Sequence, residues 1–433
     1  MNHPVARLAL AIADQLASPA ALGDMLTAQP WRVQSLSLGA PAVALLHIEV
    51  AATGLRPWQR AHDWLLCATS GEVTSGFDSH LFHGAPAIAH TLACAATVRP
   101  GAYERVLTRL NETVTADARR RVEIAHARID AGRPARLAEF DVVRGLTGVG
   151  SHLLRHDPDG RTIRSLLEYL VRLTEPVTVD GETLPGWWTP DGPSGRAEQR
   201  MRGGHANAGL AHGIAGPLAL LSLAALEGVV VDNQRDAIGR VVGWYDRIRA
   251  DTATGHTIWP YWASRAELRT GPMHLPEQQR PSWCYGTAGV GRALQLAARA
   301  TGDLGRALQA ETALVHALTD PRQRDTISDP GLCHGYAGIA HVATQIAADA
   351  APASTTRLEA LVAKLLDDAV LPSDSMPDAR AAPLLHSGAG PGLLDGAAGV
   401  ALACLAASGM TPRSGWDTCL LITAATNARG EDA

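Results

Sequence analysis

The chain has 433 residues, of which 46% are hydrophobic, so it has enough apolar sequence for a large core and is not a disordered chain. Its net charge of -5 gives no electrostatic basis for binding nucleic acid or an anionic membrane, and we expect neither partner. The six cysteines include no C-x-x-C pair and do not form the framework of a small disulfide-rich protein, so we expect a reducing, cytoplasmic location.

The first predicted element is a helix over residues 5–16. This segment is similar to the apolar core of a secretion signal, but Asp14 interrupts it and Arg7 is the only full positive charge nearby, so we interpret it as an amphipathic helix. Residues 100–134 are charged and follow a helical pattern, which predicts an accessory insertion. We find no accessory β-structure in the sequence.

Two later segments differ from the amphipathic helices around them: one breaks the helical pattern, and the other is more apolar than the rest of the chain. Residues 186–204 are rich in Gly, Pro and Trp, which is typical of a loop or lid. Within them, Trp187 and Trp188 form either a packed anchor or an apolar rim for a peptide, and we favour the anchor. Residues 214–226 are the most apolar segment, but they are too short to span a bilayer, so we expect no membrane insertion.

A short motif recurs along nearly the whole chain: a glycine, two further residues, and then Gly or Ala at the head of an apolar, alanine-rich run. It occurs seven times, beginning at Gly39, Gly84, Gly145, Gly213, Gly286, Gly335 and Gly396. Each copy opens a segment with helical periodicity, and the segments between copies, such as residues 358–370, have the pattern of amphipathic helices. We attribute the second small residue to a close approach of neighbouring helices.

Two helices per repeat and almost no strand signal predict an all-α fold. The spacing between copies varies and mostly exceeds the usual solenoid periods of about 20–50 residues, so long loops join the helices, and a closed ring suits them better than an open superhelix. We predict an (α/α)7 toroid of seven inner and seven outer helices, forming one domain over residues 1–433 with residues 100–134 inserted in it.

Reactive side chains gather immediately before the repeat glycines. Cys284 and Cys333 stand two positions before the glycine in successive copies, and His83, His212 and His334 stand one position before it. If the copies are structurally equivalent, these residues occupy equivalent places in the fold. Cys284, Cys333 and His334 then come together, and two thiolates with one imidazole are a donor set that suits tetrahedral Zn²⁺.

Three protein ligands leave a fourth position for water or substrate, as in catalytic zinc sites. The alternative is a closed structural site with His83 or His212 as the fourth ligand. The remaining cysteines fit the role of small buried hydrophobic residues; they are Cys67, Cys94, Cys404 and Cys419.

Three of the repeats resemble the signature motifs of the lanthionine synthetase C family, the lanthipeptide cyclases. They read LAHGIAGPLALL from Leu210, WCYGTAGVG from Trp283 and LCHGYAGIAH from Leu332. With no dehydratase region before the repeats, the chain resembles the stand-alone cyclases of that family.

The resemblance implies an α/α toroid with one Zn²⁺ per chain that adds a peptide cysteine to dehydroalanine or dehydrobutyrine, forming (methyl)lanthionine rings. It implies a dehydrated precursor peptide with a leader as substrate, and a dehydratase and a transporter as candidate partners in a complex. It assigns the metal to Cys284, Cys333 and His334, the acid/base role to His212, and further catalytic positions to Asp141, Arg280 and Tyr285.

Several of these roles have alternatives. Asp141 suits a helix N-cap as well as a catalytic role, and we favour a surface charge for Arg280 and a structural cap for Asp395. The nearest alternative function is a related zinc enzyme that adds glutathione or another small thiol to dehydroamino acids. More distant alternatives are a carbohydrate-active enzyme or zinc prenyltransferase subunit on a similar toroid, and a non-catalytic peptide-binding toroid with structural zinc.

Overall fold

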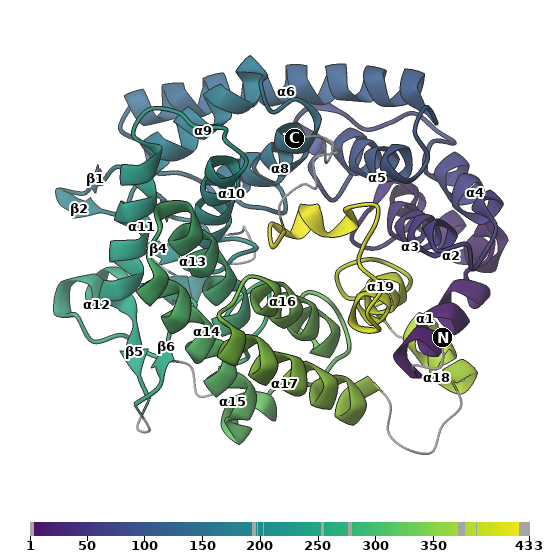
Figure 1. The fold of residues 1–433 in the computed structure, drawn as a ribbon. Coiled ribbons are helices and arrows are strands. Elements are labelled where there is room, and N and C mark those ends of the chain that lie inside the picture. Colours follow the sequence, from purple (N-terminus) through teal and green to yellow (C-terminus); the bar gives the residue numbers. More distant parts are fainter. Residues whose placement is uncertain are drawn as a thin grey trace, which may run out of the picture. The chain divides into compact units, whose positions relative to one another are not determined.

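The structure, a computed structural model, is built mainly of α-helices with a few short strands (Figure 1). It describes residues 4–192, 196, 198–201, 203–252, 255–275, 279–370, 377–386 and 388–423. By its internal contacts the chain divides into two compact units that interleave along the sequence. The first comprises Met1–Val114, Gln278–Ala288 and Leu314–Trp416, and the second Thr115–Glu277, Gly289–Ala313 and Asp417–Ala433.

A helix begins at or just after each of the seven repeat glycines, as predicted. These helices are α3 (Ala40–Ala52), α5 (Ala85–Val98), α8 (Leu146–His156), α10 (Ala215–Leu226), α13 (Thr287–Thr301), α16 (Tyr336–Ala348) and α19 (Ala397–Ala407). α3, α10 and α19 are apolar on every side and buried over most of their length, which is typical of helices enclosed by other helices.

The repeat glycine is required by the turn that leads into each helix. At all seven positions an added Cβ would lie within 2.5 Å of a neighbouring backbone atom. Gly286 also has a φ of 109°, a conformation that side chains strongly disfavour.

Our explanation of the second small residue was wrong in detail. An added Cβ at Gly338 or Gly399 would lie 1.8 Å from a backbone carbonyl oxygen of the preceding loop, that of Leu332 or Leu393. At these two positions the helix presses against its own entry loop, and the small residue makes room for that loop; at Gly216 the nearest atom is Val142 Cγ2 of the neighbouring repeat, at 2.6 Å.

A second helix follows most repeat helices and confirms the predicted two-helix repeat. These partners are α4 (Trp58–Ala68), α6 (Glu104–Asp130), α9 (Arg161–Leu173), α11 (Gln234–Ile248), α14 (Leu304–Thr319) and α17 (Pro352–Val370). They are amphipathic; α9, for example, buries Ile163, Leu166 and Leu170 along one face. Shorter helices complete the set: α2 (Gly23–Ala28), α7 (Leu137–Phe140), α12 (Arg265–Thr270), α15 (Pro321–Arg324) and α18 (Pro377–His386).

In the first unit the repeats follow one another in space, and the last lies beside the first. Helix α16 contacts α19, α19 contacts α3, and α3 contacts α5. The entry loops are joined in the same order by backbone hydrogen bonds: Cys284 N–H donates to the Cys333 carbonyl, Cys333 N–H to Leu394, and Leu394 N–H to Ser37. All four residues stand two positions before a repeat glycine, so equal offsets do occupy equivalent places.

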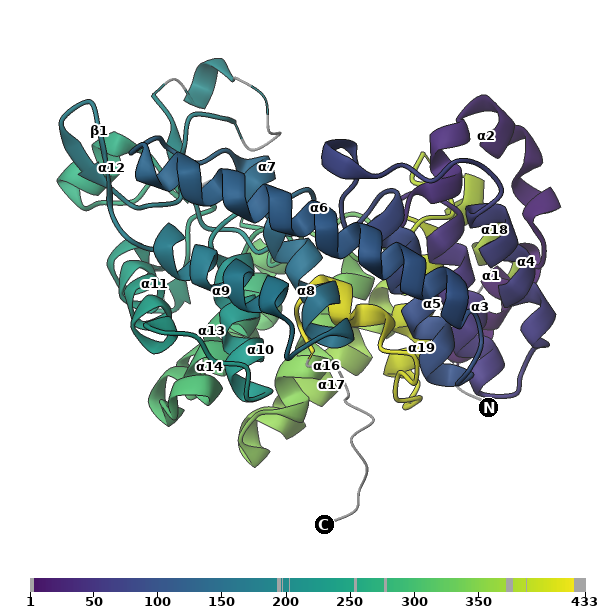
Figure 2. The same cartoon turned by 90° about the horizontal axis from the view of Figure 1, so that it is seen from above.

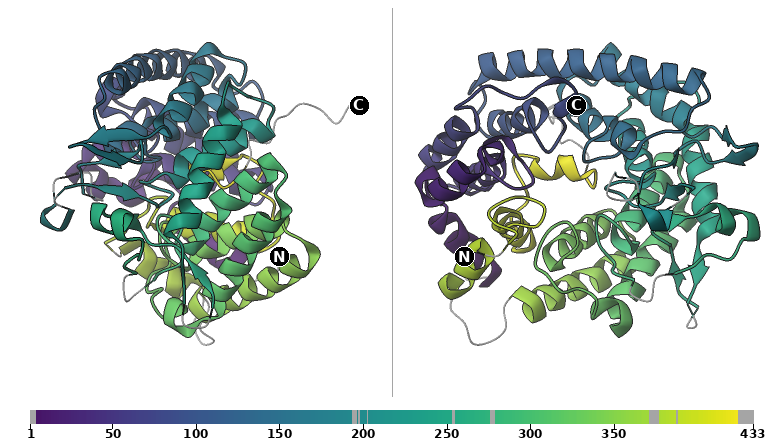
Figure 3. Two further views of the ribbon diagram at one scale, coloured as in Figure 1. Left: turned by 90° about the vertical axis from the view of Figure 1, so that its left-hand side faces the viewer. Right: turned by 180° about the vertical axis from the view of Figure 1, so that it is seen from behind.

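The N-terminal helix α1 (Pro4–Gln15) was predicted over residues 5–16 and packs beside α18 and α19, near the other end of the sequence (Figures 1 and 3). Its C-terminal end is held by two donors on the next helices, because His47 Nε2 and Trp64 Nε1 both bond to the Leu16 carbonyl, at 2.7 and 2.9 Å. This contact ties α1 to α3 and α4 within the first unit.

We expect the His47 contact to make the fold sensitive to acid. Burial lowers the pKa of His47 to about 4, whereas an unfolded histidine titrates near 6.5. The stabilisation is therefore complete above pH 6.5 and is lost as the pH falls toward 4, because over that range only the unfolded chain takes up the proton. The expected loss between pH 7.5 and pH 5 is about 2 kcal/mol.

Urea unfolding of wild type and His47→Gln at both pH values tests this, since glutamine keeps a donor for the Leu16 carbonyl but does not titrate. The variant should lose about 2 kcal/mol less than wild type on acidification. An identical loss in the two proteins would contradict the prediction.

In the second unit α8 and α10 pack together with α9 and α11, and three small antiparallel sheets lie between the helices in sequence. The strands are β1 (Val177–Val179), β2 (Glu182–Leu184), β3 (Trp188–Thr189), β4 (His205–Asn207), β5 (Ala250–Asp251), β6 (Thr257–Ile258) and β7 (Trp262–Ala263). β1 pairs with β2, β3 and β7 flank β4, and β5 pairs with β6. Our expectation of no accessory β-structure was thus wrong, because strands of two or three residues are too short to show alternation in the sequence.

The predicted insertion over residues 100–134 contains one long helix, the 27-residue α6 (Figure 2). Trp187 and Trp188 are 2% and 1% exposed, which confirms the packed anchor; parts of residues 186–204 lie outside the described residues. Among the helices that the structure describes, none is by itself long and apolar enough to cross a membrane, although α1 and the segment Pro19–Ala28 together would be, bent by 84°.

Candidate active site

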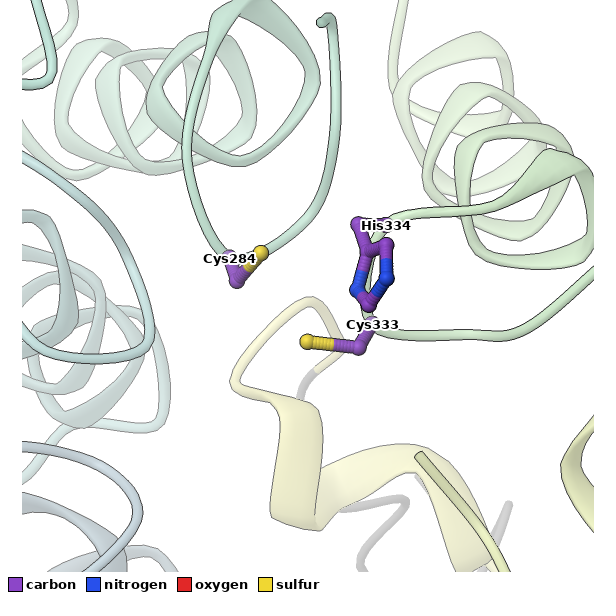
Figure 4. A group of neighbouring side chains, drawn as sticks. All are labelled: Cys284, Cys333 and His334. Carbon is purple, nitrogen blue, oxygen red and sulfur yellow. The ribbon is translucent and has the colours of Figure 1, made fainter. Parts of the chain in front are cut away.

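Three of the predicted site residues come together in the first unit. Cys284 lies on the loop before α13, and Cys333 and His334 lie on the loop before α16, so two loops supply the three side chains (Figure 4). One ligand atom from each side chain lies within 4.8 Å of the other two. The backbone bond from Cys284 to Cys333 sets this proximity, since it joins the two loops at the cysteines themselves.

This group fits a zinc ion by its chemistry and its size. Two sulfurs and one imidazole nitrogen are preferred zinc donors, and tetrahedral bonds of about 2.0–2.3 Å hold such atoms roughly 3.5–3.8 Å apart. The three ligand atoms lie within 4.8 Å of one another, and all three side chains are only half-buried, so an ion and a further ligand have access. His83 belongs to the same unit but not to this group, which leaves it without support as a fourth ligand.

The local electrostatics favour the ionised form of one thiol. A hydrogen bond from the Cys333 thiol holds the pKa of Cys284 well below its ordinary value, and the same pairing raises the pKa of Cys333. The pKa of His334 is raised, chiefly by its hydrogen bond with Cys284. Three side chains that stabilise a thiolate in this way can release their protons when they bind a cation.

Two carboxylates flank the His334 ring, one near each nitrogen. Asp329 Oδ2 lies 3.5 Å from Nε2, and Asp395 Oδ1 lies 3.5 Å from Nδ1. A histidine that binds a metal through one nitrogen commonly has its other N–H oriented by a carboxylate, and here either choice of nitrogen leaves such a partner. Asp395 was expected as a structural cap, and its contact with His334 adds it to the site.

Arg280 lies beside the same group because it pairs with Asp329. Its Nη1 lies 3.6 Å from Asp329 Oδ2, and its side chain is about one-third exposed, so it is not the freely solvated surface charge that we favoured. Tyr285 is the residue after Cys284 and is half-buried, and its carbonyl accepts hydrogen bonds from the Ser282 backbone and hydroxyl. Both residues therefore lie on the loop that carries Cys284.

Our sequence analysis missed Asp329, although a signal was present. Asp329 stands six positions before Gly335, and Asn207 stands six positions before Gly213. The side-chain oxygen of each accepts the backbone N–H two residues later, so both form the same Asx turn at the same point of the repeat. A polar residue at this offset is thus recognisable once the repeats are aligned.

The second unit holds a separate histidine–aspartate pair. His212 Nδ1 lies 2.7 Å from Asp141 Oδ2, and the two residues come from the loops before α10 and α8. The Asp141 side chain is 2% exposed, whereas that of His212 is 30% exposed. The same carboxylate also accepts, through Oδ1, the backbone N–H groups of Arg144 and Gly145 at 2.6 and 2.7 Å.

Asp141 is not the N-cap of α8, which is Gly145, and its catalytic role stays a prediction. One oxygen holds the turn before α8, and the other contacts the His212 imidazole. A buried carboxylate on Nδ1 fixes the orientation of the ring, an arrangement typical of acid/base histidines.

A family profile described as "Lanthionine synthetase C-like protein" matches residues 30–421. The chain is also similar to "Nisin biosynthesis protein NisC" of Lactococcus lactis subsp. lactis, with 24% identity over 209 residues, or 47% of this chain. That alignment covers 48% of the relative, so the chain matches about half the length of this curated protein.

A solved structure named "Nisin cyclase" matches with a TM-score of 0.75 and 20% sequence identity, over 93% of this chain and 95% of that chain. This likeness shows the fold and confirms the predicted class, since nisin cyclase is an α/α toroid.

Proposed function

Because the chain belongs to the lanthionine synthetase C-like family, we propose that it is a zinc-dependent lanthipeptide cyclase that adds peptide cysteine thiols to dehydroalanine or dehydrobutyrine. The observation that carries the proposal is the convergence of Cys284, Cys333 and His334, a soft donor set with room for a further ligand. A substrate thiol would take that remaining coordination position.

The reaction is a redox-neutral addition. A carbon–sulfur bond forms at the β-carbon of the dehydro residue, the carbon–carbon double bond becomes single, and the thiol proton is balanced by a proton added at the α-carbon. Zn²⁺ held by Cys284, Cys333 and His334 would supply the positive charge that keeps a substrate thiol ionised at neutral pH. Asp329 and Asp395 would orient the His334 ring.

The chain's own acid/base group is His212. Asp141 holds the Nδ1 proton, so proton exchange with the substrate takes place at Nε2. Protonated His212 would donate to the α-carbon of the enolate, and Asp141 would stabilise the imidazolium before that transfer. Arg280 and Tyr285 would stabilise the enolate oxygen, which bears the negative charge after thiol attack.

The substrate would be a dehydrated precursor peptide with a leader, and a dehydratase and a transporter are the partners we propose for a biosynthetic complex. All six cysteines are free thiols, which supports a reducing, cytoplasmic site of action. Residues 1–433 would act as one catalytic domain, in which residues 100–134, expected as an insertion, consist mainly of α6, the second helix of its repeat.

Intact-mass analysis after thiol alkylation tests the function. A synthetic peptide that contains one cysteine and one dehydroalanine is incubated with the enzyme and then treated with iodoacetamide. Cyclisation leaves the peptide mass unchanged and blocks alkylation, whereas an unreacted cysteine gains one carbamidomethyl group. Added glutathione separates the nearest alternative, because addition of that thiol in preference to ring closure raises the peptide mass by one glutathione and would redirect the assignment.

Substitution of Asp141 is expected to separate its two roles. Asp141→Asn keeps an oxygen for the Arg144 and Gly145 N–H groups but presents an amide to His212, so we expect a stable fold with ring formation slowed by ~10²-fold. Asp141→Ala also removes the acceptor of these two N–H groups, and should cost about 1–3 kcal/mol of stability in addition. Thermal unfolding and the alkylation assay on both variants provide the comparison; equal activity in Asp141→Asn and wild type would leave Asp141 only its role in the turn before α8.

A further inference from the structure

A groove in the second unit lies apart in sequence from all the residues assigned above. It has a volume of about 420 Å³ and is lined by α11, the β1–β2 hairpin and the residues on either side of that hairpin, with Leu268 of α12 at one edge. α11, α12 and the hairpin lie together in Figure 1. The volume is in the range of pockets that bind small molecules or a few residues of a peptide.

Ion pairs join α12 to the β1–β2 hairpin beside the groove. Arg265 at the start of α12 pairs with Asp180 in the β1–β2 turn at 2.8 Å, and Arg269 of the same helix pairs with Glu182 of β2. These contacts satisfy the acidic groups of the hairpin with cations outside the groove. No acidic residue is among those that line the groove.

Two cations on α11 lie on the groove without an ionic partner. Arg240 and Arg247 are exposed, and neither forms an ion pair within the part of the chain that the structure describes. Arg240 donates its Nε–H to the Thr174 hydroxyl at 3.0 Å. A positively charged site in a chain of net charge -5 favours an anionic ligand.

Two buried tryptophans support the groove from behind. Trp187 and Trp244 are 2% and 3% exposed and pack edge to face at 5.0 Å. Their indole N–H groups are buried as well, so these side chains shape the groove and do not bond to a ligand in it. The donors that the groove offers to a ligand are the guanidinium groups of Arg240 and Arg247.

Gly243 leaves open space on the groove lining. It lies in the interior of α11, and an added Cβ there would meet no atom within 4 Å. A large side chain at this position would extend into the groove, so Gly243 is a suitable position for a variant that blocks it.

We propose that this groove binds an acidic, extended segment of the substrate peptide, with its carboxylates paired to Arg240 and Arg247 and its backbone between α11 and the β1–β2 hairpin. The two arginines are seven positions apart on α11, about 10 Å along the helix axis. Acidic side chains two or four residues apart on one face of an extended peptide are about 7 or 13 Å apart, a range that flexible arginine side chains can meet. The identification of the ligand as part of the substrate rests on the proposed function. The preference of the groove for an acidic peptide does not depend on that function.

Fluorescence anisotropy with the full chain tests the proposal. The probe is a fluorescein-labelled decapeptide in which aspartate alternates with leucine, and the reference peptide has asparagine in place of aspartate. We expect the acidic probe to bind more tightly than the reference, and Arg240→Gln and Arg247→Gln each to weaken its binding about three- to tenfold. Gly243→Leu should fill the groove and abolish binding while unfolding at the same temperature as wild type or higher.

Two matched variants on the same helix region serve as controls. Gly239→Leu adds the same side chain one turn earlier in α11, outside the groove and also in open space, and Arg249→Gln removes an exposed charge just beyond the helix. Both should bind the probe as wild type does. Equal binding by Gly243→Leu and wild type, equal affinity for the two peptides, or displacement of the probe by inorganic phosphate at similar concentration would each overturn the proposal.

The binding test of the groove and the ring-formation test of the proposed function can fail independently of each other. Ring formation by a wild-type protein that does not bind the acidic probe would overturn the groove alone. Binding of the probe in the groove by a protein that forms no rings would overturn the cyclase assignment, and with it the identity of the ligand as substrate, but not the acidic-peptide site.

Discussion

Cys284→Ala and Cys333→Ala are each expected to lose most of their zinc, whereas the purified wild-type protein should contain close to one zinc per chain. Each variant removes one of three converging donors. Even substitutions beyond the ligands commonly reduce metal affinity by about 10- to 100-fold, so removal of a ligand should exceed that loss. Metal analysis by mass spectrometry after dialysis against a weak chelator provides the measurement.

Both variants should remain folded. The cysteines lie on entry loops and are half-buried, and the bond that joins the loops runs between backbone atoms, from Cys284 N–H to the Cys333 carbonyl. Cys67→Ala is a suitable control, because Cys67 is also a half-buried free thiol but does not belong to the group. Wild-type protein without zinc, or zinc content unchanged in both variants, would refute the metal site.

His212→Asn is expected to slow ring formation by ~10²–10⁴-fold, the usual contribution of general acid/base catalysis, while it keeps its zinc. The expectation rests on the 2.7 Å contact between His212 Nδ1 and the buried Asp141 carboxylate. Asparagine can keep a hydrogen bond to Asp141 through its amide N–H, but it cannot carry a proton to the substrate.

Zinc content and ring formation should be measured on the same preparation of His212→Asn. A loss of zinc together with activity would make His212 a fourth ligand and the site a closed one. Unchanged ring formation would remove the acid/base role. His62→Asn is a useful control, since His62 also uses Nδ1 in a hydrogen bond, to the Tyr103 hydroxyl, but belongs to neither group.

The location of the metal group could be predicted because the repeats make distant parts of the sequence equivalent. Cys284 and Cys333 have the same offset from their glycines, and equal offsets are bonded to one another between neighbouring entry loops. Residues that share an offset can therefore be expected to lie close together even when they are far apart in the sequence. Asp329 also has a repeated offset, shared with Asn207, but a single carboxylate among many is recognisable only after its contact with His334 is seen.

The sequence by itself determined the features that depend on local geometry. The seven glycines mark seven helix starts, because an added Cβ at each would meet backbone atoms of its own turn, and the apolar runs after them specify buried helices. Only the tertiary structure decided which side chains meet across long separations. Asp141 and His212 are 71 residues apart, and the groove combines α11 with strands of three residues that leave no pattern in the sequence. Such contacts depend on how packed helices bring their loops together, and the spacing of residues along the sequence does not show which loops will meet.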